Sequence, residues 1–455
     1  MSSKRQKILN EALAEKRDGE AATPEAEGSE LHHATKEPEI PGMSTLMEEV
    51  VHSENAKKAL KKVLQNKGAP GVDGMTVDKL PGYLRQHWTA IRQQLLNGTY
   101  APHAVKRVDI PKPGGGMRQL GIPTALDRFI QQAMLQVLQK YWDKTFSDSS
   151  CGFRPGRSAH QAVQQAQKYV SSGLRYVVDI DLEKFFDKVN HDVLMGLIAK
   201  RTGDKRVLKT IRAYLNAGIM ENGLVQARDE GTPQGGPLSP LLSNVMLDVL
   251  DKELERRGHK FARYADDQNI YVASERAGKR VMQSITSFLT RKLRLKVNTE
   301  KSAVDLPQKR KFLGFSFTYG ATPKRRIAPQ ALSRMKKKVR ELTRKTKGQS
   351  LEQVAESLKR YLTGWRGYFS FCETPSVLAS LDQWIRRRLR RLAWKQWKRG
   401  RKRFAELTRR GVGKDLAAQT AGSPHGAWHL SNSPALSIAL PNKFFASLGV
   451  PTLSR

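Results

Sequence analysis

Residues 261–272 read Phe-Ala-Arg-Tyr-Ala-Asp-Asp-Gln-Asn-Ile-Tyr-Val. Two adjacent carboxylates, Asp266 and Asp267, stand between short apolar and aromatic runs that favour β-strands. The pattern predicts a β-hairpin whose two-residue tip holds both aspartates. Like charges this close are unfavourable unless a cation or hydrogen-bond donors neutralise them. The stretch therefore indicates either an Asp-Asp turn on the surface or a site for a pair of divalent ions, about 3.5–4 Å apart, of the kind that drives phosphoryl transfer.

A second acidic strand precedes this hairpin. Residues 176–181 read Tyr-Val-Val-Asp-Ile-Asp, and the β-branched residues predict a buried strand that ends in acids. Asp179 and Asp181 have the same strand parity, so both side chains would lie on one face. Asp181 is the better candidate for a third site carboxylate because it lies nearer the strand end, where a ligand can reach it.

The overall composition indicates a large protein that binds a polyanion. The chain has 455 residues, which suggests about three domains, and 39% of them are hydrophobic. The formal net charge is +37, from 80 basic and 43 acidic residues. RNA or DNA is the leading candidate partner for so basic a chain, and an anionic membrane surface is the second.

The sequence also excludes several classes. No apolar run approaches the roughly 18 residues of a membrane-spanning helix, and the N-terminus lacks a signal-peptide core. We therefore expect no membrane partner. The two cysteines, Cys151 and Cys372, exclude a disulfide framework and a four-cysteine zinc site. These features predict a cytoplasmic protein.

Three segments carry candidate ligand-binding residues. Residues 105–122 predict a basic hairpin in which Lys112 and Arg118 flank a glycine turn and could close on a triphosphate, although such a hairpin is also often simply solvated. Arg154 and Arg157 lie in a Gly/Pro loop ahead of a helix from residue 159, a site for a phosphate or an ordinary capped loop. Gln234 lies in the loop 231–240, where glycines would let the backbone approach a ligand.

Beyond Pro323 the composition changes to basic helices. Helical periodicity predicts helices over 328–345, 351–370 and 375–399, and residues 411–455 show little periodicity. The third helix carries a cluster of arginines that spans too wide an arc to face a single groove. We expect part of it to contact a large folded RNA, while simple solvation of a packed helix is the alternative. The cluster comprises Arg386, Arg387, Arg388, Arg390 and Arg391.

The order of these motifs resembles the successive blocks of a reverse transcriptase. The matching features are the strand with Asp181, the Pro-Gln-Gly-Gly loop at 233–236, the Tyr-Ala-Asp-Asp hairpin and the Phe-Leu-Gly-Phe segment at 312–315. Residues 66–74, Arg118, 151–157 and 231–240 resemble the group II intron type in particular, and residues 361–369 resemble its maturase region. The resemblance covers about residues 44–400.

The resemblance implies an α+β right-hand polymerase with fingers, a palm containing an antiparallel sheet, and a helical thumb, followed by a basic C-terminal region. It implies two activities: copying RNA into DNA during retrohoming of a mobile intron, and binding the intron RNA to assist splicing. The implied partners are group II intron RNA, an RNA template, a DNA primer or target, and deoxynucleoside triphosphates.

The resemblance also implies residue roles. Asp181, Asp266 and Asp267 would be the catalytic carboxylates that hold two Mg²⁺ ions, for which Mn²⁺ could substitute. Lys112, Arg118 and Gln234 would contact the incoming nucleotide. Phe186 would exclude a ribose 2′-OH, with a core phenylalanine as its alternative. Lys301 would assist the departing pyrophosphate.

The expected domains are a disordered leader (1–43), an N-terminal extension with fingers (44–175), the palm (176–322), the thumb and maturase region (323–400) and a short basic nucleic-acid-binding tail (401–455). Longer family members carry a C-terminal nuclease with paired cysteines; no cysteine follows Cys372, so we expect that nuclease to be absent. Two alternatives remain open: a maturase whose polymerase is silent, and a reverse transcriptase of another lineage, such as a retron or a defence-associated enzyme.

Overall fold

The computed structural model describes residues 45–111, 116–221, 224–226, 230–232, 235–344 and 348–454. The chain forms two compact units, each with its own hydrophobic core. The first unit contains the chain up to Ala166 and Leu174–Asp305, and the second contains Gln167–Gly173 and the chain from Leu306 onward. The predicted leader over residues 1–43 lies outside the described residues.

Helices enclose the core of the first unit. The helices are α2 (Leu46–Val51), α3 (Ser53–Asn66), α4 (Leu80–Asn97), α5 (Ala125–Trp142), α6 (Ala159–Ser171), α7 (His191–Ala199), α8 (Lys205–Asn216), α9 (Ser239–Arg256) and α10 (Glu275–Leu293), with short 3₁₀ turns at Val77–Lys79, Asp143–Thr145 and Phe185–Asp187. Between α7 and α8 the chain starts a new helix, because the Asp204 side chain accepts a hydrogen bond from Arg206 N and caps it.

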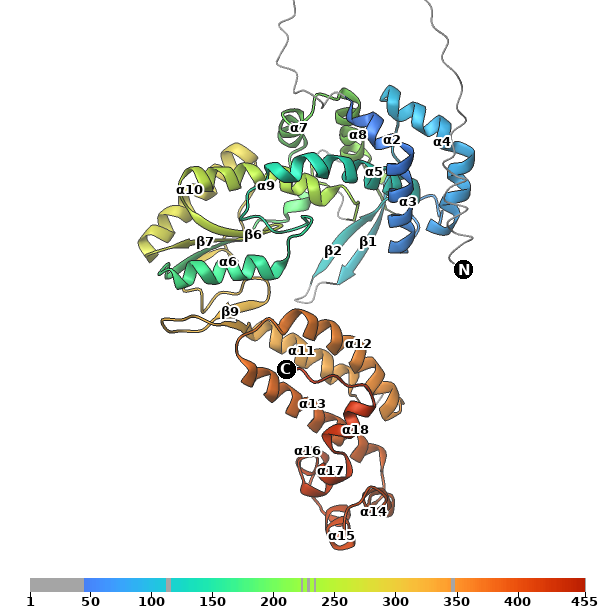
Figure 1. The fold of residues 1–455 in the computed structure, drawn as a ribbon, viewed down its shortest axis with the longest axis vertical. Helices are drawn as coiled ribbons and strands as arrows, with labels where there is room; N and C mark the ends of the chain where they lie inside the picture. Colours follow the sequence, from blue (N-terminus) through green and yellow to red (C-terminus); the bar gives the residue numbers. More distant parts are fainter. Residues whose placement is uncertain are drawn as a thin grey trace, which may run out of the picture. The chain divides into compact units, whose positions relative to one another are not determined.

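The sheet that carries the acidic motifs has four strands in the order β6-β7-β3-β8, and all of its pairings are antiparallel. Figure 1 shows α9 and α10 beside this sheet. Val178 and Ile270 are fully buried at its centre, facing the helices' apolar side chains. The strands are β3 (Tyr176–Ile180), β6 (Lys260–Tyr264), β7 (Asp267–Val272) and β8 (Ala303–Asp305).

A second four-stranded sheet contains the predicted basic hairpin and has the order β2-β1-β4-β5. Its strands are β1 (Val105–Pro111), β2 (Met117–Ile122), β4 (Ile219–Glu221) and β5 (Leu224–Gln226). The β1–β2 hairpin is confirmed, with Ile110 paired to Arg118. Lys112 lies outside the described residues, and for Arg118 the structure describes only the backbone.

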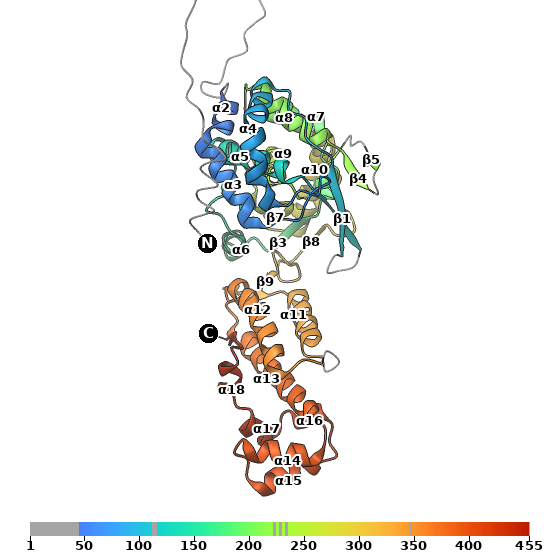
Figure 2. The same ribbon diagram turned by 90° about the vertical axis from the view of Figure 1, so that its right-hand side faces the viewer.

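The second unit begins with a small two-stranded sheet and continues as helices. Its first elements are β9 (Phe315–Phe317), β10 (Arg325–Ile327), α11 (Pro329–Leu342), α12 (Leu351–Phe369) and α13 (Pro375–Gln396). Figure 2 shows α11, α12 and α13 packed together. The Phe-Leu-Gly-Phe segment belongs to this unit, because Tyr368 donates a hydrogen bond to the carbonyl of Leu313 at 2.8 Å.

The C-terminal residues are more ordered than the sequence predicts. Residues 400–454 form short helices whose apolar side chains join one core with α11–α13, so the expected separate tail is part of this unit. Asp382 on α13 accepts hydrogen bonds from the backbone of Leu453 and Ser454. Periodicity failed here because helices of four to ten residues are too short to show a repeat. They are α14 (Gly400–Arg409), α15 (Lys414–Gly422), α16 (Ala427–Leu430), α17 (Pro434–Ala439) and α18 (Asn442–Ser447).

The structure is an α+β protein, as predicted, with mostly antiparallel sheets in which only the β1–β4 strand pairing is parallel among the described residues. The first compact unit ends at Asp305, whereas the expected palm extends to residue 322. In the part of the chain that the structure describes, no helix is long and apolar enough to cross a membrane.

Candidate active site

Strand register brings the two acidic motifs together. The β3–β7 ladder runs from Tyr176 opposite Val272 to Ile180 opposite Gln268. The next position along both strands places Asp181 opposite Asp267, at the open end of the ladder. Asp181 is partly exposed and Asp267 is exposed, so a ligand can reach both.

The hairpin turn differs by one residue from the prediction. Tyr264 pairs with Asp267, so the two central residues of the turn are Ala265 and Asp266, and Asp267 begins β7. Of the two central residues only Ala265 has a positive φ, 57°. A non-glycine residue with left-handed φ destabilises the folded state by roughly 1–2 kcal/mol, so other contacts must stabilise the turn.

The segment before β8 holds Asp181 from the other side. Asn298 N donates to the Asp181 carbonyl at 2.8 Å, and Asp181 N donates to Ser302 Oγ at 2.9 Å. Lys301 lies between these two residues, and its Nζ is 3.8 Å from Asp181 Oδ2. The structure thus places the sequence-predicted Lys301 beside a predicted catalytic carboxylate.

Asp179 lies one residue pair deeper, opposite Asn269 and Ala303. The Asn269 side-chain amide donates to Asp179 Oδ1 at 3.2 Å in the amide orientation that satisfies both groups. Asn269 is buried, so Asp179 is engaged within the sheet while Asp181 faces its open end.

The donor chemistry of the site suits a hard cation, because Mg²⁺ binds carboxylate oxygens. However, among the residues that the structure describes, no three Asp, Glu, His or Cys side chains converge closely enough to hold one ion. Lys301 Nζ, 3.8 Å from Asp181 Oδ2, offsets part of the negative charge at this carboxylate. The residues present fit a divalent ion in chemistry and in register.

The two adjacent phenylalanines after Asp181 have different environments. Phe185 is 2% exposed and belongs to the core, whereas Phe186 is partly buried and packs edge-on against it with ring centroids 5.2 Å apart. The Phe186 carbonyl accepts a hydrogen bond from Thr232 N at 2.6 Å, which ties it to the glycine-rich loop. Phe186 is therefore the more accessible of the two.

Gln234 lies outside the described residues. The glycines around it approach neighbouring protein backbone: a Cβ on Gly235 would lie 2.6 Å from the Gly121 carbonyl of β2, and one on Gly231 would lie 2.8 Å from the Asp187 carbonyl. Both glycines have positive φ. Because glycine adopts positive φ and has no Cβ, these two positions can approach β2 and the turn after Asp181 closely.

Arg154 and Arg157 occupy different surroundings. Arg154 is 8% exposed, and its guanidinium N–H groups donate to Asp143, Ser147 and Ser150. The Arg154 guanidinium therefore holds the loop's own framework, and a phosphate contact by Arg154 stays a prediction. Arg157 remains partly exposed and pairs with Asp148.

The arginine cluster on α13 is partly engaged within the second unit. Arg387 lies 4.1 Å from the Trp428 ring centroid and donates to the Trp428 carbonyl. Arg388 donates to Thr343 Oγ1 at 2.8 Å, and burial, together with Arg391 and Arg340, lowers its pKa to about 10. Arg390 donates to the Leu440 carbonyl, while Arg386 and Arg391 are partly exposed. Arg387 and Arg390 therefore hold the C-terminal helices against α13, and Arg388 binds the end of α11.

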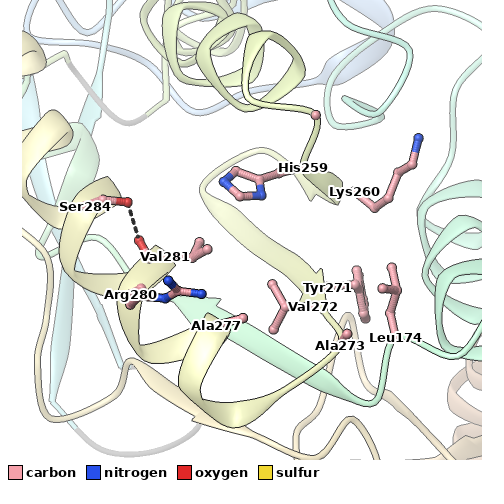
Figure 3. Close-up of a pocket in the computed structure, with 11 residues that line it drawn as sticks. Leu174, His259, Lys260, Tyr271, Val272, Ala273, Ala277, Arg280, Val281 and Ser284 are labelled. Atoms are coloured by element: carbon pink, nitrogen blue, oxygen red, sulfur yellow. Dashed lines mark hydrogen bonds between the residues drawn. The ribbon is translucent and has the colours of Figure 1, made fainter.

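A pocket of about 510 Å³ lies at the opposite end of the sheet. Figure 3 shows His259 across the pocket from side chains of α10, with Tyr271 and Val272 at the end of β7. Burial lowers the pKa of His259. Val272 lies five residue steps along β7 from Asp267, about 17 Å in an extended strand, so this pocket is not part of the carboxylate site.

Sequence reasoning missed the residues that support the turn. Arg263 is completely buried, and its guanidinium contacts Asp251 and Asn244 of α9 as well as the Ala265 carbonyl. The available signal was an arginine flanked by apolar residues in a strand next to the Asp-Asp pair. A buried arginine in such a strand requires an acidic partner and carbonyl acceptors.

Comparisons with known proteins agree with this geometry. Residues 110–317 match the family model described as reverse transcriptase (RNA-dependent DNA polymerase), and residues 332–411 match that of the group II intron maturase-specific domain. The first match contains Asp181, Asp266 and Asp267, and the second contains α12, α13 and the arginine cluster.

The chain is 38% identical over 218 residues to protein YkfC of Escherichia coli, an alignment that covers 47% of this chain and 57% of that protein. It is 37% identical over 211 residues to the group II intron-encoded protein LtrA of Lactococcus lactis, which covers 46% of this chain and 35% of that protein. The alignments thus span less than two thirds of either relative. Among solved structures, a partial Cas6-RT-Cas1–Cas2 complex has a TM-score of 0.36 and 25% identity, covering 54% of this chain and 42% of that one.

Proposed function

We propose that this chain is a group II intron-encoded reverse transcriptase with a maturase domain, which copies RNA into DNA and binds its parent intron RNA to assist splicing. The observation that supports polymerisation most directly is the strand register that sets Asp181 opposite Asp267, with Asp266 in the adjoining turn. These three carboxylates lie together at the open end of the β3–β7 ladder, where a primer terminus and a triphosphate could meet.

In the proposed reaction the 3′-oxygen of a DNA primer attacks the α-phosphate of a deoxynucleoside triphosphate. The new bond joins that oxygen to phosphorus, the α–β phosphoanhydride bond breaks, pyrophosphate leaves and the proton of the 3′-hydroxyl passes to solvent. Reverse transcriptases require divalent metal, and we infer two Mg²⁺ ions, replaceable by Mn²⁺, held by Asp181, Asp266 and Asp267. When bound, such ions stabilise negative charge on the attacking and leaving oxygens.

The chain's own side chains would position the substrates. Phe186, partly exposed after Asp181, lies where an aromatic ring could exclude a ribose 2′-hydroxyl. Lys301, 3.8 Å from Asp181, supplies positive charge for the pyrophosphate. We retain Lys112, Arg118 and Gln234 as proposed nucleotide contacts, supported by their places in the hairpin and the glycine-rich loop.

The second unit supports a separate RNA-binding role, because it has its own core and matches the maturase-specific model. We propose group II intron RNA as its partner and the cytoplasm as its location. The net charge of +37 favours a large polyanion over a small ligand.

Primer extension tests the polymerase. Purified protein, an RNA template, a DNA primer and deoxynucleotides should yield full-length DNA with Mg²⁺ and none after chelation by EDTA. Absence of extension by protein that still binds its intron RNA would instead support a maturase with a silent polymerase. Finding the gene outside any ribozyme-like RNA would favour a reverse transcriptase of another lineage.

A further inference from the structure

Arg263 is a fully buried cation one residue before Tyr264 in β6. Its Nε donates to Asp251 Oδ1 at 2.8 Å, and its Nη2 donates to Asp251 Oδ2 at 2.5 Å. Both members of this ion pair are 0% exposed. Removing two charges from water is costly, and an apolar pair of the same volume would fill the space without that cost. Neutralising Asp251 therefore does not by itself explain why an arginine occupies this position.

The remaining nitrogen of Arg263 reaches the catalytic turn. Its Nη1 donates to the Ala265 carbonyl at 2.9 Å and to Asn244 Oδ1 at 3.0 Å. Ala265 is the residue with positive φ, and it directly precedes Asp266. The orientation of its carbonyl reports the orientation of the peptide that carries Asp266, so a donor fixed at that oxygen fixes the direction of the carboxylates.

The opposite side of the turn is held by residues 149–152. Cys151 N donates to the Arg263 carbonyl at 2.9 Å, and Arg263 N donates to the Ser149 carbonyl at 2.9 Å. Gly152 lies so close that a Cβ there would be 2.2 Å from Ala265 N. Asn244 closes the arrangement, because its Nδ2 donates to the Gly152 carbonyl at 2.9 Å while its Oδ1 accepts from Arg263.

We propose that Arg263 is a positioning residue for the carboxylate hairpin: its fixed guanidinium, anchored on α9 by Asp251 and Asn244, holds the Ala265 carbonyl and so orients Asp266 and Asp267. This inference rests on the proposed polymerase function. A guanidinium serves all three acceptors at once because its N–H groups diverge in one rigid plane. An ammonium in the same place would neutralise Asp251 without reaching both Asn244 and Ala265.

The test compares Arg263→Lys with wild type and with Arg201→Lys. Arg201 is a matched control because it also pairs with a buried aspartate of α9, Asp248, at 2.5 Å. Arg201 also donates to Thr145, away from the turn. Single-nucleotide incorporation on an RNA template gives kcat and KM, a Mg²⁺ titration gives the half-saturating concentration, and thermal unfolding gives Tm. All rates are measured well below the lowest Tm.

We expect Arg263→Lys to lower kcat at least about tenfold and to raise the half-saturating Mg²⁺ concentration, with primer–template affinity unchanged, because misplacing reacting groups by an ångström reduces rate steeply. Arg201→Lys should lower Tm comparably and leave both kinetic quantities near wild type. Equal kinetics for the two variants would overturn the inference.

A second variant covers the case in which Arg263→Lys does not fold. Asn244→Ala leaves the Arg263–Asp251 ion pair intact and removes the link to Gly152. It should also raise the half-saturating Mg²⁺ concentration, and a folded Asn244→Ala protein with wild-type metal dependence would contradict the proposed arrangement. Inactive wild-type protein would instead refute the polymerase function, so the two failures are distinguishable.

Discussion

Lys301 Nζ lies 3.8 Å from Asp181 Oδ2, on the segment whose backbone also binds the Asp181 peptide. The lysine therefore offsets the charge of a carboxylate that we expect to bind metal. With a divalent ion bound at Asp181, the Lys301 ammonium would be available to contact a phosphate group of the nucleotide.

Lys301→Met should raise the KM for deoxynucleotides by about tenfold with a smaller change in primer affinity, because a charge-assisted hydrogen bond to phosphate contributes about 1.5–3 kcal/mol. Steady-state incorporation as a function of nucleotide concentration measures this. Lys296→Met is the control, since Lys296 lies on the same segment and pairs with Glu183 at 3.3 Å. A KM equal for the two variants would exclude a phosphate contact by Lys301.

Asp266→Asn and Asp267→Asn should each lower the extension rate at least about a hundredfold, because either change removes a ligand from the proposed metal site. Asp305→Asn provides a control in the same sheet. Asp305 pairs with Val177, which lies four residues before Asp181 on β3. Its rate should stay close to that of wild type. Undiminished extension by either site variant would refute the assignment of the carboxylates.

Phe186→Ala should increase the ratio of ribonucleotide to deoxynucleotide incorporation, because it removes the partly exposed ring proposed to block the 2′-hydroxyl. Phe185→Ala should instead lower the free energy of unfolding by about 3–5 kcal/mol, as expected for a core phenylalanine, without changing that ratio. Single-nucleotide incorporation and denaturant unfolding distinguish the two. An unchanged ratio for Phe186→Ala would mean that the sugar is selected elsewhere.

Intron binding should depend more on exposed basic residues than on the packed arginines. Lys398, Arg399 and Arg401 are exposed after α13, whereas Arg387 and Arg388 bind groups within the unit. Replacing the exposed three with glutamine should weaken intron affinity. It should also reduce the log–log salt slope by about 0.7–0.9 for each phosphate that the protein no longer neutralises.

The comparison variant replaces Arg387, Arg388 and Arg391 with glutamine. It should lower the Tm of the second unit as well as weakening RNA binding, because two of its arginines hold Trp428 and Thr343. Filter binding across a salt series measures the intron affinity and the salt slope of both variants. Wild-type affinity and slope in both would show that this surface does not bind the RNA.

Glu406 on α14 should make the stability of the second unit pH-dependent. A hydrogen bond from Arg409 lowers the Glu406 pKa from 4.5 to about 2, with Lys402 acting in the same direction. A lowered folded-state pKa gives stability that is fully present above pH 4.5 and is lost as pH falls towards 2. Glu406→Gln should unfold more easily at pH 7, and its difference from wild type should shrink below pH 4.5. A constant difference at all pH values would contradict this.

Much of the site could be predicted because its signals are local in sequence. The acids of β3 and the Asp-Asp pair each follow a recognisable strand, and the antiparallel order of such strands brings their ends together. The shift of the turn to Ala265 and Asp266 could not be predicted, since it depends on contacts with Gly152 and Arg263. The intramolecular partners of Arg154 could not be predicted for a similar reason: its acceptors come from residues 143–150, and only the folded loop brings them around it.

The order of the second unit was also underestimated. The helices after residue 400 are short, and their stability comes from burial against α13, which no local repeat reveals. Asp382 and the arginines of α13 both contact this segment, so residues that look like a basic surface in sequence serve partly as internal packing.

The carboxylates emerge from the two interior strands of the four-stranded sheet, since β7 lies between β6 and β3, and β3 lies between β7 and β8. Backbone amides of such strands exchange with solvent only when neighbouring strands separate, which usually requires opening of the whole structural unit. The amides of Val178 and Ile270, at the centre of the β3–β7 ladder, should therefore be among the slowest to take up deuterium. On gradual heating, the capacity for DNA synthesis should persist until the first unit melts as a whole.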